Sequence, residues 1–124
     1  MPDPLMLEKR RIRRNFTRAA AGYDRAAVLS REACARMLER LDLVRLTPLR
    51  ILDIGSGTGV AARAVAQRYP KAQVTALDFC LPALQMQRRA GFWSTALRAA
   101  LGRGAIRCVC ADFERSPVRT GVMD

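Results

Sequence analysis

The sequence contains no histidine, only two lysines and few aromatic residues. The absence of histidine removes one of the commonest metal ligands, so we do not expect a metal centre. No apolar run approaches the roughly 18 residues that span a bilayer, and the first residues lack the basic-then-apolar pattern of a secretory signal. We therefore expect a soluble, cytoplasmic protein.

Cysteine is present at four positions, Cys34, Cys80, Cys108 and Cys110. Cytosolic thiols normally stay reduced, so these residues do not indicate a disulfide framework. Cys108 and Cys110 are separated by one residue, and in a strand that spacing puts both side chains on the same face, as for any pair of core residues. We interpret the four cysteines as structural thiols.

Charge is unevenly divided, with 22 basic and 11 acidic side chains and a net charge of +11. A field of this sign favours acidic partners, which could be nucleic acid or an acidic carrier protein. Arginines spread over solvated helix faces explain the same composition. The one dense basic cluster, at residues 9–14, has no aromatic residues alternating with it, which is more typical of a solvated helix than of a nucleic-acid site.

The length of 124 residues is sufficient for one domain with its own core. Residues 1–46 are predicted to form a basic helical arm at about 5–21 and, after a break at Gly22, a second helix with Asp24 as a possible N-cap. Apolar residues at three- and four-residue steps predict the face of this second helix that packs on the sheet: Ala26, Leu29, Ala33, Met37, Leu41 and Val44.

Residues 47–124 are predicted to form the sheet domain. The expected order is a strand at 50–54, a glycine turn at 55–59, a helix at 60–69, a strand at 73–77, a helix at 82–89, a connection with a short helix at 91–104 and a strand at 105–110. The mostly apolar first strand is typical of a parallel sheet covered on both faces. The pattern predicts the α/β class with a right-handed βαβ unit.

Three acidic residues fall at the carboxyl ends of the three predicted strands: Asp53, Asp78 and Asp112. An open α/β sheet binds its ligand at these strand ends, beside the amino termini of the helices. Glycine at the first turn lets a ligand approach the backbone closely, and free N–H groups at a helix start attract anions. The sequence therefore predicts a ligand site at this edge of the sheet.

The spacing of the glycine turn helps to distinguish between cofactors. Gly55, Gly57 and Gly59 form G-x-G-x-G, and Val60 stands where the dinucleotide fingerprint has its third glycine. Asp53 would repel a pyrophosphate but could accept the ammonium group of an amino acid. A nicotinamide-binding domain remains the alternative, and it would need room for a pyrophosphate beside this acid.

The other acids suit the remaining parts of an amino acid joined to a nucleoside. Asp78 lies about 20 residues past the turn, where an acid accepts the ribose hydroxyl groups. Asp112 could accept the adenine amino group. The apolar neighbours of the adenine ring would then be Phe79, Cys80, Leu81 and Phe113.

These segments resemble the class I S-adenosylmethionine-dependent methyltransferases. Residues 51–59, Ile-Leu-Asp-Ile-Gly-Ser-Gly-Thr-Gly, are similar to the first motif of that family, and residues 76–78 and 111–113 to its second and third sites. The resemblance implies a Rossmann-like fold that binds S-adenosylmethionine, with 47–124 as a partial cofactor domain. The implied cofactor-binding residues are Tyr23, Asp53, Gly55, Ser56, Gly57, Thr58, Gly59, Asp78, Phe79, Cys80, Asp112 and Phe113.

Residues 14–24 and 38–41 are similar to the amino-terminal helices of the malonyl-acyl carrier protein O-methyltransferases of biotin synthesis. That resemblance implies methylation of the free carboxylate of a malonyl thioester on acyl carrier protein, whose acidic surface the basic arm would meet. Because a carboxylate is already ionised at neutral pH, the reaction needs alignment more than a general base, and no catalytic residue is assigned. A methyltransferase for another small molecule and a basic nucleic-acid-binding module are the alternatives.

Members of this family continue into a fourth strand that pairs with the first. The sequence ends where that strand is expected, so we predict a fold truncated after the third strand, with residues 50–54 at an open apolar edge. A fragment, an inactive truncated remnant and a chain that associates through this edge all agree with the pattern.

Overall fold

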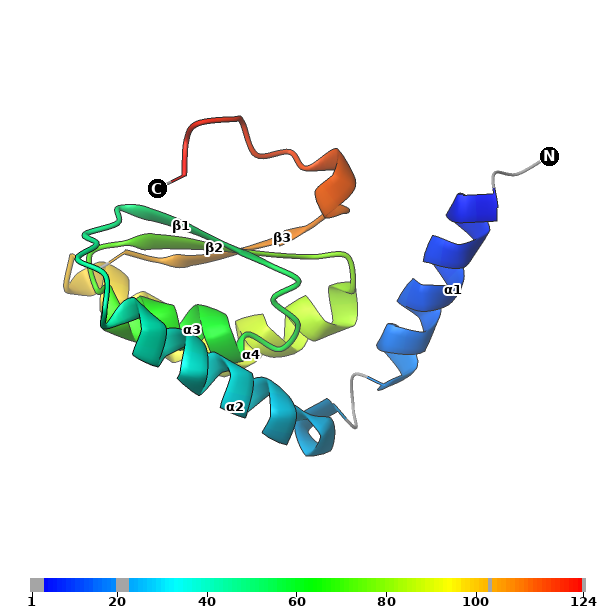
Figure 1. The fold of residues 1–124 in the computed structure, drawn as a ribbon, viewed down its shortest axis with the longest axis horizontal. Helices are drawn as coiled ribbons and strands as arrows, with labels where there is room; N and C mark the ends of the chain where they lie inside the picture. The colour runs from blue at the N-terminus through cyan, green and yellow to red at the C-terminus, as the bar shows by residue number, and fades with distance from the viewer. Residues whose placement is uncertain (1–3, 20–22, 103, 124) are drawn as a thin grey trace.

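The computed structural model describes residues 4–19, 23–102 and 104–123. Within these ranges the chain forms a three-stranded sheet with α-helices before and between the strands (Figure 1). The elements are α1 (Pro4–Ala19), α2 (Tyr23–Leu41), β1 (Arg50–Ile54), α3 (Val60–Arg68), β2 (Gln73–Asp78), α4 (Leu81–Ala100), β3 (Ile106–Cys110) and the 3-10 turn η2 (Phe113–Arg115).

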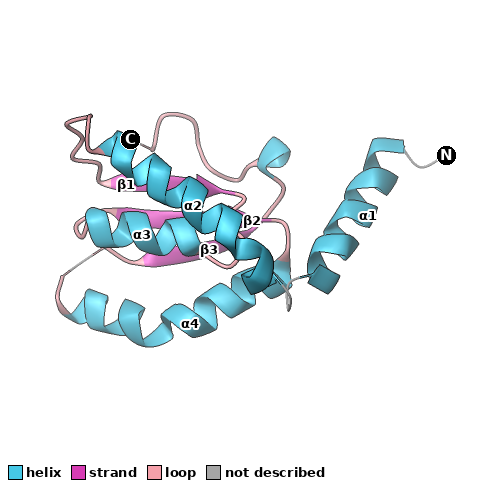
Figure 2. Ribbon diagram, turned by 60° about the horizontal axis from the view of Figure 1, so that its bottom comes forward, coloured by secondary structure: helices cyan, strands magenta, loops and turns pink. Residues whose placement is uncertain are grey.

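The sheet is parallel, with strand order β1-β2-β3. Asp53 of β1 pairs with Ala76 of β2, which pairs in turn with Cys108 of β3. Helices α2, α3 and α4 lie on one side of the sheet, and the segment after β3 runs back along the other side (Figures 1 and 2). The predicted α/β class and parallel strands are confirmed, and β1 is an edge strand of the described sheet.

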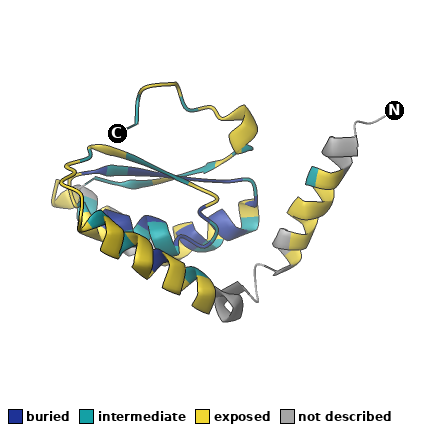
Figure 3. Cartoon of the chain, viewed as in Figure 1, coloured by how far each residue is buried: buried dark blue, intermediate teal, exposed yellow. Residues whose placement is uncertain are grey.

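The core lies between the sheet and α3. Alternate residues of β2, Val74 and Ala76, are fully buried against Ala62, Val65 and Ala66 of α3. Small side chains on the helix let it lie close to the central strand, where buried positions concentrate (Figure 3). The result is a closely packed β1-turn-α3-β2 unit that places the carboxyl ends of two neighbouring strands side by side.

Helix α4 corrects one prediction. The sequence predicted a helix at 82–89 followed by a connection at 91–104, whereas α4 runs unbroken from Leu81 to Ala100. A glycine inside a helix costs only about 1 kcal/mol relative to alanine, and the good helix formers Ala, Leu, Arg, Ala and Ala occupy residues 96–100. Helix α4 as a whole contacts β2 and β3.

The buried face of α2 corrects a second prediction. Leu29 is 78% exposed, and Ala33, Met37 and Val44 of the predicted stripe are also exposed. The inward residues are Cys34, which is buried, and Leu38, which packs on the core beside α3. Cys34 and Leu38 each follow a residue of the predicted stripe, Ala33 and Met37, by one position. Both pairs have the spacing of a helix face, so periodicity alone could not tell which pair meets the core. Asp24 lies inside α2 rather than at an N-cap.

Helix α1 forms over most of the predicted arm. It contacts α4 and lies apart from the sheet (Figure 1). Lys9 reaches across to Asp112 and Glu114 after β3, which fastens the helix to the opposite end of the chain. Among the described residues, no helix has the length and apolar character to cross a membrane. The boundary between residues 46 and 47 stays a prediction, and the predicted break at Gly22 lies outside the described residues.

Candidate functional site

The turn between β1 and α3 depends on three glycines in the left-handed backbone region. Gly55, Gly57 and Gly59 have φ of 70°, 54° and 87°. Side chains disfavour this region, so the turn can follow this path only with glycine at these positions. The predicted G-x-G-x-G segment is therefore required by the backbone geometry, and the turn ends where α3 begins at Val60.

Most N–H groups of the glycine turn are bonded within the protein. The N–H groups of Gly55 and Ser56 donate to the carbonyl of Leu77, at 2.8 and 3.1 Å, and that of Gly59 donates to the carbonyl of Ser56 at 2.9 Å. These bonds fasten the turn to the end of β2. Gly59 supplies no side chain to cap α3. Within the first turn, the N–H of Arg63 donates to the carbonyl of Gly59 and that of Ala62 donates to Asp53, so Val60 and Ala61, which line the hollow described below, are the positions where an anion could meet the helix start.

Asp78, the last residue of β2, is hydrogen-bonded to the glycine turn through its carboxylate. Its Oδ2 accepts a hydrogen bond from the N–H of Gly57 at 2.9 Å, and its Oδ1 accepts one from the N–H of Cys80 at 2.7 Å. The residue is 7% exposed. Each carboxylate oxygen can accept more than one hydrogen bond, so these contacts leave acceptor capacity for ligand hydroxyl groups.

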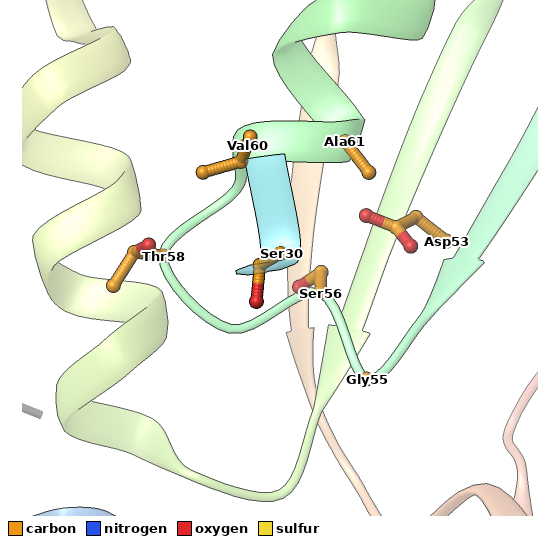
Figure 4. Close-up of a pocket in the computed structure, with 7 residues that line it drawn as sticks. All are labelled: Ser30, Asp53, Gly55, Ser56, Thr58, Val60 and Ala61. Atoms are coloured by element: carbon orange, nitrogen blue, oxygen red, sulfur yellow. The ribbon is translucent and has the colours of Figure 1, made fainter. Parts of the chain in front are cut away.

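A hollow of about 120 Å³ lies over the turn. Its lining comes from β1, the turn, the first residues of α3 and one residue of α2 (Figure 4). The predicted residues in this lining are Asp53, Gly55, Ser56 and Thr58, and the residues that sequence reasoning missed are Ser30, Val60 and Ala61.

Asp53 is the charged group in the lining of this hollow. Its Oδ2 is buried without a hydrogen-bond partner in the described structure. Burial, and then the negative charge of Asp78, raise the pKa of Asp53, while a hydrogen bond from the N–H of Ala62 opposes them. A carboxylate in this position is stabilised by a cation, and a ligand ammonium group is a cation of suitable size.

Asp112 lies past the end of the neighbouring strand and does not line the hollow. It accepts hydrogen bonds from Lys9 at 2.8 Å and from the N–H of Glu114 at 3.1 Å. Lys9, and then this backbone bond, lower the pKa of Asp112, which favours its ionised form. Phe113 beside it is 59% exposed and therefore available to an incoming ring.

The remaining predicted residues are distributed around this edge of the sheet. Cys80 is buried and Phe79 half-buried, directly after Asp78. Tyr23 is the first residue of α2, about two turns before Ser30, and its side chain lies outside the described residues. The structure thus places Asp53 and part of the turn in the lining of the hollow, with Asp78 bonded to the turn but outside that lining. Asp112 follows the next strand at the same edge of the sheet.

Two residues that lie at the hollow or contact the glycine turn belong to no recognisable sequence motif. Ser30 comes from α2, in a region where the sequence carries no glycine or acid signature. Gln87 of α4 is 3% exposed and accepts a hydrogen bond from Ser56 Oγ at 3.3 Å. The sequence feature that points to Gln87 is its spacing: it lies one helical turn after Ala83 and Leu84, which are buried, so a polar residue falls on the buried face of the helix.

The chain matches known methyltransferases along its whole length. The family model described as "Methyltransferase domain" matches residues 51–124. A malonyl-[acyl-carrier protein] O-methyltransferase of Laribacter hongkongensis is 48% identical over 124 residues, which cover 100% of this chain and 41% of that protein. The corresponding protein of Gallionella capsiferriformans is 44% identical, over 98% of this chain and 41% of its own. The chain thus spans about two fifths of the length of these relatives.

The fold is shared with solved methyltransferases. The structure of the plantazolicin methyltransferase BpumL in complex with SAH superposes with a TM-score of 0.58 at 22% identity, over 99% of this chain and 40% of that one. This likeness confirms the predicted Rossmann-like fold. The matches of sequence and fold agree with the motif at residues 51–59, and the chain belongs to the methyltransferase domain family.

Proposed function

We propose that the chain is the cofactor-binding part of a cytoplasmic S-adenosylmethionine-dependent methyltransferase that acts on malonyl-acyl carrier protein. The observation that carries the proposal is the buried, unpartnered oxygen of Asp53 beside a glycine turn and a helix amino terminus. A free amino acid carries an ammonium and a carboxylate on one carbon. Its ammonium group needs an anion of the protein and its carboxylate needs N–H donors, and few other ligands need both so close together.

The amino-acid end of the cofactor fits the hollow. Asp53 would accept its ammonium group, and the first turn of α3, where Val60 and Ala61 line the hollow, would receive its carboxylate. Ser30 adds a hydroxyl group to the same lining. Tyr23, which the family resemblance assigns to the methionine end, begins the helix that carries Ser30.

The nucleoside end would extend along the strand ends. Asp78 is fixed by two backbone N–H groups, so its remaining acceptor sites are already oriented for the two ribose hydroxyl groups. Phe79 and Cys80 follow it and offer apolar surface to the adenine ring. Asp112, which is ionised at neutral pH with or without Lys9, would accept the adenine amino group, with Phe113 beside the ring.

S-adenosylmethionine, when bound, supplies an electrophilic methyl group on a sulfonium centre. The residues of this chain contribute positioning rather than proton transfer, because a carboxylate acceptor is ionised at neutral pH and needs no base. The bonded glycine turn and Asp78 hold the site in one conformation before the ligand arrives. Such preorganisation lowers the entropy cost of aligning the reacting atoms.

The acceptor and the carrier protein follow from the relatives and from the surface of α1. The curated relatives are named for malonyl-acyl carrier protein. Helix α1 exposes five arginines that could meet an acidic carrier: Arg10, Arg11, Arg13, Arg14 and Arg18. The groups that select the acceptor would belong to the part of the relatives that this chain does not span.

The open edge of β1 is a proposed point of association with a second chain. Ile54 at the end of β1 and Leu49 just before it are both largely exposed. An apolar edge strand is a template for another strand. Light scattering over a concentration series would detect self-association of the chain, and a Lys substitution at Ile54 should then reduce it.

Calorimetry with S-adenosylhomocysteine tests the cofactor assignment. We expect one molecule to bind per chain, and NADH at the same concentration to neither bind nor compete, because Asp53 opposes a pyrophosphate. Binding of NADH without binding of S-adenosylhomocysteine would contradict the proposal and favour a nicotinamide domain. Salt-dependent binding of duplex DNA as the only detected interaction would favour the nucleic-acid alternative.

A further inference from the structure

Gln87 is a buried polar residue on the inner face of α4. Ala83 and Leu84 precede it by one helical turn and are buried apolar residues, so an apolar side chain would be expected at position 87 as well. Gln87 is nevertheless 3% exposed. Burying an amide costs free energy unless both of its ends find partners, so this residue is an unusual filler for the core.

One end of the Gln87 amide contacts the glycine turn. Ser56 Oγ donates a hydrogen bond to Gln87 Oε1 at 3.3 Å, linking α4 to a turn that is 31 residues earlier in the chain. Ser56 also lines the hollow over the turn. A change at Gln87 can therefore reach the ligand site through Ser56 without direct contact with the ligand.

The Gln87 side chain also lies directly against Gly59. A Cβ atom on Gly59 would be 2.5 Å from Cγ and 2.7 Å from Nε2 of Gln87, which is closer than real side chains approach. Gly59 is the residue from which α3 starts, with φ of 87°. Gln87 thus fills the space that the missing side chain of Gly59 leaves open.

The other end of the amide has no partner among the described residues. Gln87 Nε2 is buried without a hydrogen bond. An apolar side chain of similar length would fill the same space without this unpaired donor. Packing alone therefore does not require glutamine here, and the contact with Ser56 is the feature that an apolar residue could not supply.

We propose that Gln87 is a positioning residue of the cofactor turn: it holds Ser56 by a hydrogen bond and seats against Gly59, so that the turn keeps the conformation that the ligand needs. The proposal rests on the proposed function for the ligand involved. It makes Gln87 and Gly59 a matched pair, in which the absence of a side chain at one position makes room for the amide at the other.

The first test separates positioning from structural support. Gln87→Met keeps the length of the side chain; it removes the acceptor of the Ser56 hydroxyl and also the unpaired Nε2, so the two effects oppose each other and the urea midpoint of unfolding should change little. The Kd for S-adenosylhomocysteine should rise about fivefold, the scale of one hydrogen bond. Gln85→Met makes the same change at an exposed position of α4 and should alter neither quantity. Equal binding by the wild-type chain and Gln87→Met would contradict the role of Gln87. Failure of the wild-type chain to bind would contradict the proposed function instead.

The second test uses stability and needs no ligand. Gly59→Ala should lower the urea midpoint through both its positive φ and its overlap with Gln87, and Gln87→Ala in the same chain should restore part of the loss. Gly55→Ala, with φ of 70° and open space around the position, carries the backbone strain alone, so Gln87→Ala should not rescue it. Additive effects of Gly59→Ala and Gln87→Ala would overturn the proposed pair.

Discussion

The segment from β1 to the start of α4 and the two amino-terminal helices differ sharply in how they are held. The first combines a strand that is buried from Val74 to Asp78, a turn in which most N–H groups are bonded, and the carboxylate of Asp78, which accepts a hydrogen bond from the turn. The second is largely exposed, with Leu29 facing solvent on α2 and α1 fastened through Lys9. The contrast is visible in the distribution of buried positions (Figure 3).

The difference indicates where the protein has a fixed geometry and where it can adapt. A cofactor turn must be preorganised, because every hydrogen bond that forms only after binding adds an entropy cost. A surface that meets a large partner can remain open until the partner arrives. The four predictions below test this contrast, from the largest expected effect to the smallest.

Leucine truncation compares the two regions directly. Leu77→Ala removes a side chain that is 2% exposed at the end of β2, and we expect it to lower the free energy of unfolding by about 2–5 kcal/mol. Leu29→Ala makes the same change on the exposed face of α2 and should cost less than about 0.5 kcal/mol. Urea unfolding of both variants measures the difference, and similar losses would show that α2 is buried in solution.

Removal of Asp78 should have the largest effect on the ligand. Asp78→Ala leaves the N–H groups of Gly57 and Cys80 unbonded and removes the proposed acceptor for the ribose, so we expect binding of S-adenosylhomocysteine to weaken by about 100-fold. Glu39→Ala removes an exposed acid of α2 and serves as the control. Calorimetry on the two variants checks the prediction, and comparable affinities would remove Asp78 from the site.

The pH dependence of binding should report Asp53. Because burial raises the pKa of Asp53, its ionised form destabilises the ligand-free fold above that pKa, and the free energy of unfolding should rise as the pH falls through it. A ligand ammonium favours the ionised form, so affinity for S-adenosylhomocysteine should fall over the same pH range. Asp53→Asn should bind more weakly at neutral pH and lose most of this pH dependence. Titrations by calorimetry across that range, with Glu39→Gln as control, would contradict the assignment if Asp53→Asn kept the wild-type profile.

The smallest effect is expected at the tether of α1. Lys9→Ala breaks the contacts with Asp112 and Glu114, so amide hydrogen exchange in α1 should become faster while affinity for S-adenosylhomocysteine changes little. Lys71→Ala removes the only other lysine from an exposed position and should leave exchange in α1 unchanged. Mass spectrometry of deuterium uptake measures both. Unchanged protection of α1 in Lys9→Ala would show that the ion pairs do not hold the helix.

The parts of the fold that the sequence predicted are those fixed by local chemistry. The β1-turn-α3 unit was predicted because glycines at positive φ, an apolar strand and a following helix lie within 20 consecutive residues. The end of β2 at Asp78 followed from the same logic. In contrast, the long helix α4 was missed because Gly91 looks like a helix end unless the packing against β2 and β3 is known.

The parts that were missed depend on contacts between distant segments. The inward face of α2 is set by α3, and two apolar faces one residue apart gave no way to choose between them. Ser30 and Gln87 reach the turn from separate helices. Lys9 meets Asp112 across 103 positions of sequence, and neither residue carries a local signal for that pairing.

The central claim is that the hollow over the glycine turn takes the ammonium and carboxylate of an amino acid joined to a nucleoside. Calorimetry with S-adenosylhomocysteine and with its analogue lacking the amino group tests this directly. The wild-type chain should bind the complete ligand more tightly, by about tenfold or more, and in Asp53→Asn the two ligands should bind with nearly equal Kd. Equal affinity of the wild-type chain for the two ligands would contradict the account.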